Sequence, residues 1–342
     1  MRLQPATAAA SIAGVLCLLI APSLVSEYHL GQLTLNISLS LLALSLAYLW
    51  GYGGVLSFGH AAFFGLGGYA FAVVALNTAD AWAGLAGAAG CSAMFAAALG
   101  YFVFYGRLND VYLGVVTLVV SLILFKVMSH TAGPEYTIGS ASLGGYNGIP
   151  GLPGLHVPFP SDVPLDDSTL FRVSLAVLII AYVGLKSLQQ TLFGHLTLAI
   201  REHEGRAALL GYNVRLHKVF VFALSGALAG LAGGMFASHQ AFVDPNTLAL
   251  PLSAQCLVWV IIGGRGTLIG PVLASIGLQQ IITKLSETAA FDTNLLLGGL
   301  FVIAVVVLPR GLAPTFSDAV ARGGASIKRR IASNSDKVEA LT

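Results

Sequence analysis

The segment from Lys186 to Lys218 reads KSLQQTLFGHLTLAIREHEGRAALLGYNVRLHK and separates two long apolar parts of the chain. It contains seven of the 32 charged residues of the protein. A link between two buried helices needs only about 2–8 residues, so this segment is far longer than a link requires. We therefore expect it to face water, and we expect the apolar runs on both sides of it to be membrane spans.

The middle of this segment has the spacing of an amphipathic helix. One face is formed by positions i, i+4, i+7, i+11 and i+14, which are Leu196, Ile200, His203, Ala207 and Leu210. Glu202 and Arg206 lie four residues apart on another face, in the order that favours a surface ion pair. We interpret the helix as a water-exposed element offered to a partner. The alternative is a helix that lies on the lipid surface without a partner.

Two glycines bear on the extent of this helix. Gly211 follows the last apolar position of the face and predicts a left-handed stop. Gly205 weakens the middle of the helix by about 1 kcal/mol relative to alanine. The segment therefore forms either one helix or two short helices with a joint at Gly205.

The composition defines the class of protein. Hydrophobic residues make up 56% of the chain and charged residues only 9%, whereas a soluble domain carries about 25% charged residues. The chain is predicted to be an all-α, polytopic transmembrane helical bundle with about 8–10 membrane segments. The three cysteines all lie in apolar runs, so neither a disulfide framework nor a metal cluster is expected.

The apolar runs divide the chain into a membrane domain, residues 1–310, and a polar basic tail, residues 311–342, expected to be partly disordered. A first run ends near Val25, and we expect it to be an uncleaved span and not a secretory signal. Residues 130–168 hold six prolines and several acids, which predicts a loop outside the membrane with turns near Gly144. The remaining runs begin and end as follows: 30–50, 61–76, 82–105, 111–128, 170–185, 219–237, 252–262, 268–282 and 294–308.

The basic residues predict the orientation of these spans. If the amino terminus is cytoplasmic and ten segments cross, 14 of the 17 Lys and Arg residues fall on the cytoplasmic side. The 186–218 segment is then cytoplasmic, and the 130–168 loop lies on the opposite face. Segments 252–262 and 268–282 are short, so they form either two crossings or one re-entrant pair, and the charges do not distinguish these alternatives.

Two apolar regions are interrupted by glycine clusters, at 51–59 and at 263–266. Irregular backbone persists at membrane depth only where protein or a water-lined cavity surrounds it, and paired interruptions of this kind mark the path in many transporters. We therefore take Ser57, Gly59, His60, Gly263 and Gly264 as candidate path residues. The alternative interpretation is that each cluster is a tight turn, with His60 capping a helix.

Several functions are disfavoured by the absence of motifs. The sequence has no G-x-x-x-x-G-K-[ST] loop for ATP and no H-E-x-x-H zinc motif. Few ionisable residues lie deep in the spans, which argues against a proton-coupled carrier. A source of energy outside this chain is consistent with an exposed docking helix, although a channel or carrier that acts alone stays as an alternative.

Four motifs together resemble a known family. They are WGYGGVLSFGHAAFFG at 50–65 with Gly67-Gly68-Tyr69, AIREHE at 199–204 with LGYNV at 210–214, LSGALAGLAG at 224–233, and GGRGTLIGP at 263–271. The chain resembles the LivM-type permease of branched-chain amino acid ABC transporters over roughly residues 30–312. The GGRGT stretch also resembles the permeases for urea and short amides in the same superfamily.

The resemblance implies an inner-membrane permease subunit without an ATPase site or cofactor of its own. It would pair with a LivH-type second permease, two cytoplasmic ATPases that bind ATP, and a periplasmic binding protein; no nucleic acid is expected. Glu204 and Gly211 take the places of Glu and Gly in the E-A-A-x-x-x-G importer motif, and Arg206 stands where Ala is usual. The expected ATPase-docking residues are Arg201, Glu202, Glu204, Arg206 and Gly211.

Overall fold

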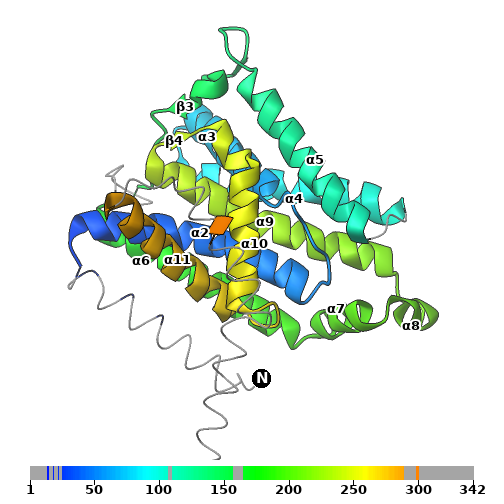
Figure 1. Ribbon diagram of the computed structural model, residues 1–342. Helices are drawn as coiled ribbons and strands as arrows, with labels where there is room; N and C mark the ends of the chain where they lie inside the picture. The colour runs from blue at the N-terminus through cyan, green and yellow to red at the C-terminus, as the bar shows by residue number, and fades with distance from the viewer. Residues whose placement is uncertain are drawn as a thin grey trace, which may run out of the picture.

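The protein is described here by a computed structural model, which places residues 25–106, 110–156 and 165–288 and the single residues 14, 18, 22, 298 and 299. Within these ranges the chain is mostly helical, as predicted (Figure 1). The helices are α2 Glu27–Gly51, α3 Ala61–Thr78, α4 Ala81–Tyr105, α5 Asp110–Ser129, α6 Asp167–Gln189, α7 Leu192–Glu202, α8 Glu204–Leu209, α9 Val214–Gln240, α10 Leu250–Gly263 and α11 Ile269–Thr288.

Six of the described helices, α2 to α6 and α9, are long and apolar enough to cross a membrane. Each starts and ends within about five residues of the predicted run, because a span is encoded directly by the length of its apolar stretch. The chain is therefore a multi-pass membrane protein. The predicted first and last spans, and the tail after residue 310, lie outside the described residues apart from a few single positions.

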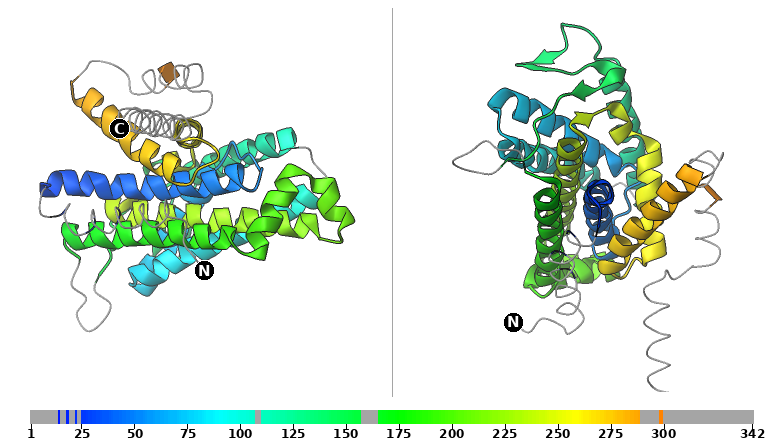
Figure 2. Two further views of the ribbon diagram at one scale, coloured as in Figure 1. Left: turned by 90° about the horizontal axis from the view of Figure 1, so that it is seen from below. Right: turned by 90° about the vertical axis from the view of Figure 1, so that its left-hand side faces the viewer.

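Helix α2 lies in the middle of the bundle. It packs against α6, α9, α10 and α11, and Figure 2 shows it nearly end-on with these helices around it. A helix that is apolar on every side is stable only when it is surrounded, and α2 is buried along most of its length. Its serine and threonine hydroxyls bond back to the preceding turn, as Ser40 Oγ does to the Asn36 carbonyl at 2.7 Å, so these groups are satisfied without water.

Small residues allow α3, α4 and α9 to approach closely. A side chain added at Gly67 of α3 would overlap the carbonyl of Gly230 in α9, and one added at Gly233 would overlap the carbonyl of Phe64. Close backbone approach of this kind is how helices associate where no hydrophobic effect separates lipid from protein. The LSGALAGLAG motif is thus a packing surface of α9.

The polar loop at 130–156 folds into short strands at one end of the bundle. β1 Thr137–Ile138 pairs with β2 Ala141–Ser142, and β3 Ile149–Pro150 pairs with β4 Phe242–Val243, both antiparallel. The 3-10 helices η1 Gly145–Asn147 and η2 Pro245–Leu248 complete this end. Gly144 has a φ of 68°, which confirms the turn predicted at this position.

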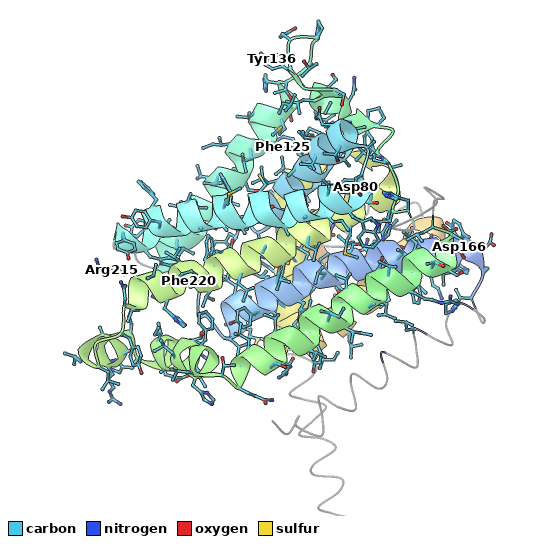
Figure 3. The ribbon with its side chains drawn as sticks, turned by 180° about the vertical axis from the view of Figure 1, so that it is seen from behind. Asp80, Phe125, Tyr136, Asp166, Arg215 and Phe220 are labelled. Atoms are coloured by element: carbon cyan, nitrogen blue, oxygen red, sulfur yellow. The ribbon has the colours of Figure 1, made fainter. Side chains whose placement is uncertain are left out.

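The two ends of the bundle differ in charge. Figure 3 places Arg215 at the end that carries α7 and α8, and Asp80 and Asp166 toward the other end. We call the end with β1 to β4 the strand end and the end with α7 and α8 the α7 end. Helix α10 begins beside η2 at the strand end. Arg265, which follows α10, lies against Gly51 at the α7 end. Helices α10 and α11 thus run between the two ends. Helix α10 has only 14 residues, and neither helix is among the six described helices that are long and apolar enough to span a membrane, so the choice between two crossings and a re-entrant pair stays open.

Candidate functional site

The polar segment 186–218 forms two short helices joined at His203. Thr191 begins α7, because its Oγ1 accepts a hydrogen bond from the Gly194 amide at 3.4 Å. The backbone of His203 is extended, with φ −158°, and its Nδ1 accepts from the Arg206 amide at 3.4 Å to begin α8. The joint is therefore at His203 and not at Gly205, because a side-chain cap forms there. Gly211 has a φ of 88°, the left-handed stop that the sequence predicts.

The apolar face of this segment is shorter than the sequence suggests. Ile200, Ala207 and Val214 form a small buried cluster, with Leu196 packed against it. His203 and Leu210, predicted on the same face, are exposed, and Leu210 is 77% exposed. The prediction of one continuous face was wrong at these two positions, because the break at His203 changes the helical phase of all residues that follow.

The charged side chains of α7 and α8 pair differently from the prediction. The pair expected between Glu202 and Arg206 is not formed, because the two residues lie on different helices. Glu202 instead meets Arg201 at 2.5 Å, and Glu204 meets Lys218 of α9 at 2.6 Å. Glu202, Glu204, Arg206 and Gly211 all lie exposed at this end of the molecule.

Arg201 connects α7 to the core of the bundle. Its guanidinium donates a hydrogen bond to the carbonyl of Gly51 at the end of α2, and its side chain is only 34% exposed. Gly54 has a φ of 71°, and a side chain added there would meet the methylene groups of Arg201. The residue predicted to contact a partner thus also ties α7 to the end of α2 and to the segment that follows it.

The glycine cluster at 263–266 meets the cluster at 51–59 near the end of α2. Tyr52 Oη donates to the Gly266 carbonyl at 3.0 Å, and the Arg265 guanidinium lies 4.4 Å from the centroid of the Trp50 ring. Burial raises the pKa of the Tyr52 phenol, so its hydroxyl stays protonated and remains a donor. The structure therefore brings the 51–54 and 263–267 segments and Arg201 together at one junction.

At this junction the cluster at 263–266 is a tight turn, as the alternative interpretation predicts. Gly264 has a φ of 97°, and the Thr267 amide donates to its carbonyl at 3.1 Å. A side chain added at Gly263 would overlap the backbone of Pro271 in α11. Gly263 and Gly264 thus let α10 and α11 approach closely at the α7 end.

The first cluster continues into a buried connection between α2 and α3. The Phe58 amide donates to Thr117 Oγ1 of α5 at 3.1 Å, and the Ala61 amide donates to Ser253 Oγ of α10 at 3.0 Å. Gly59 lies directly on the backbone of Thr117, where a side chain would overlap. The segment after Gly51 therefore turns back among the helices before α3 begins.

His60 is fully buried in this connection. Its Nε2 lies 2.8 Å from Ser45 Oγ, which itself donates to the Leu42 carbonyl, so Nε2 carries the proton and donates. Its side chain forms no capping bond to α3, so the predicted capping role was wrong. His60 Nδ1 and Ser57 Oγ are buried and have no hydrogen-bond partner among the described residues.

A polar cavity of about 430 Å³ lies elsewhere, between α2, α9, η2, α10 and α11. Its lining includes none of the five predicted path residues. Carboxamides such as Gln32, Asn36 and Gln279 form part of the cavity lining, and these three lie in apolar runs of the sequence. A search of the spans for carboxamides as well as for ionisable groups would have found these residues.

No group of three or more His, Cys, Asp or Glu residues within the described ranges is arranged to hold a metal ion. Cys91 and Cys256 are free thiols, and Cys17 lies outside the described residues. The candidate functional features of the described residues are therefore the exposed charged helices α7 and α8, their junction with the core, and the polar cavity.

The chain matches the family described as "Branched-chain amino acid transport system / permease component" over residues 28–306. It is 30% identical over 316 residues to the high-affinity branched-chain amino acid permease LivM of Escherichia coli K12, which covers 86% of this chain and 72% of that protein. The autoinducer 2 permease LsrC of Enterobacter sp. 638 is 34% identical over 40% of each chain. The L-arabinose permease AraH of Azospirillum brasilense is 32% identical over 35% of this chain and 37% of that protein.

No solved structure matches this chain significantly. The fold and the sequence together define a helical, multi-pass transport component. The chain belongs to the permease family of the branched-chain amino acid transport systems and is therefore a permease subunit of an ABC transporter.

Proposed function

We propose that this chain imports branched-chain amino acids as one of two permease subunits of an ABC importer in the bacterial inner membrane. A LivH-type permease would be its partner in the membrane. Two cytoplasmic ATPases would bind ATP, so that this chain needs no cofactor, and a periplasmic binding protein would deliver the substrate. The similarity to LivM extends over 86% of the chain, whereas the sugar and autoinducer permeases match 35–40%, and this difference favours amino acids.

The observation that carries the proposal is the connection between α7 and the core. Glu202, Glu204 and Arg206 are exposed at one end, and Arg201 joins the same helix pair to the carbonyl of Gly51. A movement of α7 would thus act on α2, the central helix, and on the junction with α10 and α11. ATP-driven movement of the partner subunits would in this way reorient the path by alternating access.

Docking is tested by copurification of the ATPase with the complete complex. Glu204→Trp adds bulk to the exposed surface of α8 and is expected to abolish copurification. The same substitution removes the ion pair with Lys218, so Lys218→Met is the matched control: it breaks the pair without adding bulk to α8. Equal retention of the ATPase by both variants would refute the docking role.

The substrate is tested in liposomes that contain the complete complex and its binding protein. We expect ATP-dependent uptake of leucine, with no competition from L-arabinose or urea. Uptake of arabinose or urea in place of leucine would overturn the assignment to amino acids. Uptake by this chain alone, without ATPase subunits, would identify a channel or carrier that acts by itself.

A further inference from the structure

The polar cavity lies near the strand end of the bundle, among elements far apart in the sequence. Gln32 and Asn36 come from consecutive turns of α2, Gln255 from α10, and Gln279 and Thr283 from consecutive turns of α11. The end of α9, the η2 turn and Phe64 of α3 supply most of the remaining described lining. Its volume of about 430 Å³ is within the range of small-molecule sites, about 300–1,000 Å³.

The described lining of the cavity is rich in carboxamides. Nine of the fourteen described lining residues are polar, and six of them are carboxamides: Gln32, Asn36, Gln240, Asn246, Gln255 and Gln279. Polar groups buried without partners cost free energy, so a protein keeps them chiefly for function. Gln279 is the clearest case, because its buried Oε1 has no hydrogen-bond partner among the described residues.

Among the described residues that line the cavity, Asp244 is the only carboxylate, and none is Lys, Arg or His. One of its carboxylate oxygens accepts a hydrogen bond from Asn246 Nδ2 at 2.6 Å, and its backbone carbonyl accepts from Thr247 Oγ1 at 2.7 Å. These contacts fix the turn that carries the carboxylate. Within the described residues Asp244 forms no ion pair, so its carboxylate is available to a cation.

We propose that this cavity is a substrate-binding site on the translocation path, and that the Asp244 carboxylate binds the ammonium group of a zwitterionic amino acid. The carboxamide N–H groups are then available to the carboxylate of the substrate. Leu35, Leu39, Phe64 and Leu252 supply an apolar surface for its side chain. The inference rests on the proposed function for its substrate class, and it adds a site that differs from the predicted path residues.

The first experiment compares Asp244→Asn with the parent complex in leucine uptake. Asparagine keeps the shape and the turn but loses the charge, and a hydrogen bond to a charged group is worth enough to reduce uptake at low leucine by about tenfold to a hundredfold. Stimulation of ATP hydrolysis by the loaded binding protein is expected to stay within about twofold, because the docking surfaces are unchanged. A variant damaged in folding would lose both activities.

Asp80→Asn is the matched control. Asp80 begins α4 near the same end of the bundle, through a 2.8 Å hydrogen bond from the Trp82 amide to its carboxylate. It does not line the cavity, and asparagine caps a helix as well as aspartate does. We expect uptake by this variant to equal that of the parent complex.

Gln279→Leu separates a binding role from a structural one. Leucine removes a buried oxygen that has no partner among the described residues, so the complex is expected to be at least as resistant to heat as the parent. Uptake is nevertheless expected to fall about tenfold, because the cavity loses a group that would contact the substrate. A purely structural residue would change both measurements in the same direction.

The outcomes distinguish the two proposals. If the parent complex imports leucine and both cavity variants import it at the parental rate, the cavity is not a substrate site and the importer assignment stands. If the parent complex does not import leucine, the assignment to amino acids is overturned together with the role of Asp244. If both cavity variants lose uptake but retain stimulated ATP hydrolysis, the inference is supported.

Discussion

The two glycine clusters look alike in the sequence but differ in the structure. The segment 263–267 makes a tight turn at the α7 end, and a methyl group added at Gly266 would meet no atom within 4 Å. The segment 51–60 begins at the same junction and then passes among α5, α9 and α10. It contains the buried His60 and Ser57, each with one polar atom that has no partner among the described residues.

The difference shows that a glycine cluster has no single meaning in a membrane protein. Glycine at Gly264 permits a left-handed backbone conformation, whereas at Gly59 it permits contact between two backbones. The N–H and C=O groups of irregular backbone at membrane depth need hydrogen-bond partners in neighbouring protein. Thr117 and Ser253 accept such bonds from backbone amides of the first cluster and the start of α3. Partners of this kind, and not the glycine count, distinguish a buried connection from a surface turn.

The largest effect is expected from substitutions that test this difference in packing. Gly59→Ala would place a methyl group on the Thr117 backbone and is expected to destabilise the complex by about 3 kcal/mol. Gly266→Ala adds the same methyl group in open space and is expected to cost less than about 0.5 kcal/mol. The measurement is the heat resistance of the purified complex in detergent. Equal losses in the two variants would contradict the contrast.

A smaller effect is expected from the polar groups of the first cluster. Ser45→Ala removes the acceptor of His60 Nε2 and leaves a buried donor unpaired, at a cost of about 2 kcal/mol. Ser57→Ala removes a hydroxyl without a described partner, so we expect its heat resistance to equal or exceed that of the parent. If Ser57→Ala were the more damaging change, the Ser57 hydroxyl would have a partner that the described contacts do not include.

Most of the fold could be predicted from the sequence, and the reason is physical. The limits of α3 and α4 agree closely with the apolar runs, since the length of a span and its hydropathy are both local properties. The stop at Gly211 was equally local, because a left-handed residue there favours glycine. The joint at His203 was missed because it depends on a side-chain cap that competes with continuing the helix.

The candidate site was only partly predictable. The exposed acids and bases of α7 and α8 were found because charge is visible along the chain, whereas the inward position of Arg201 depends on Gly51, 150 residues away. The cavity was missed because its lining residues come from separate elements and are mostly uncharged. The docking role of α7 and α8 and the binding role of the cavity remain predictions that the experiments above would test.

The smallest effect is expected where the two clusters meet. Tyr52→Phe removes the hydroxyl that donates to the Gly266 carbonyl but keeps the ring, which stacks on Tyr48 at 6.2 Å. The loss is expected to be about 1 kcal/mol, the net worth of one hydrogen bond. Tyr146→Phe is the control, because Tyr146 is 64% exposed in the strand-end loop. If Tyr52→Phe matched this control in heat resistance, the bond would not hold the clusters together, and Arg201 and Arg265 would remain as the contacts that join α7, α2 and the α10–α11 turn.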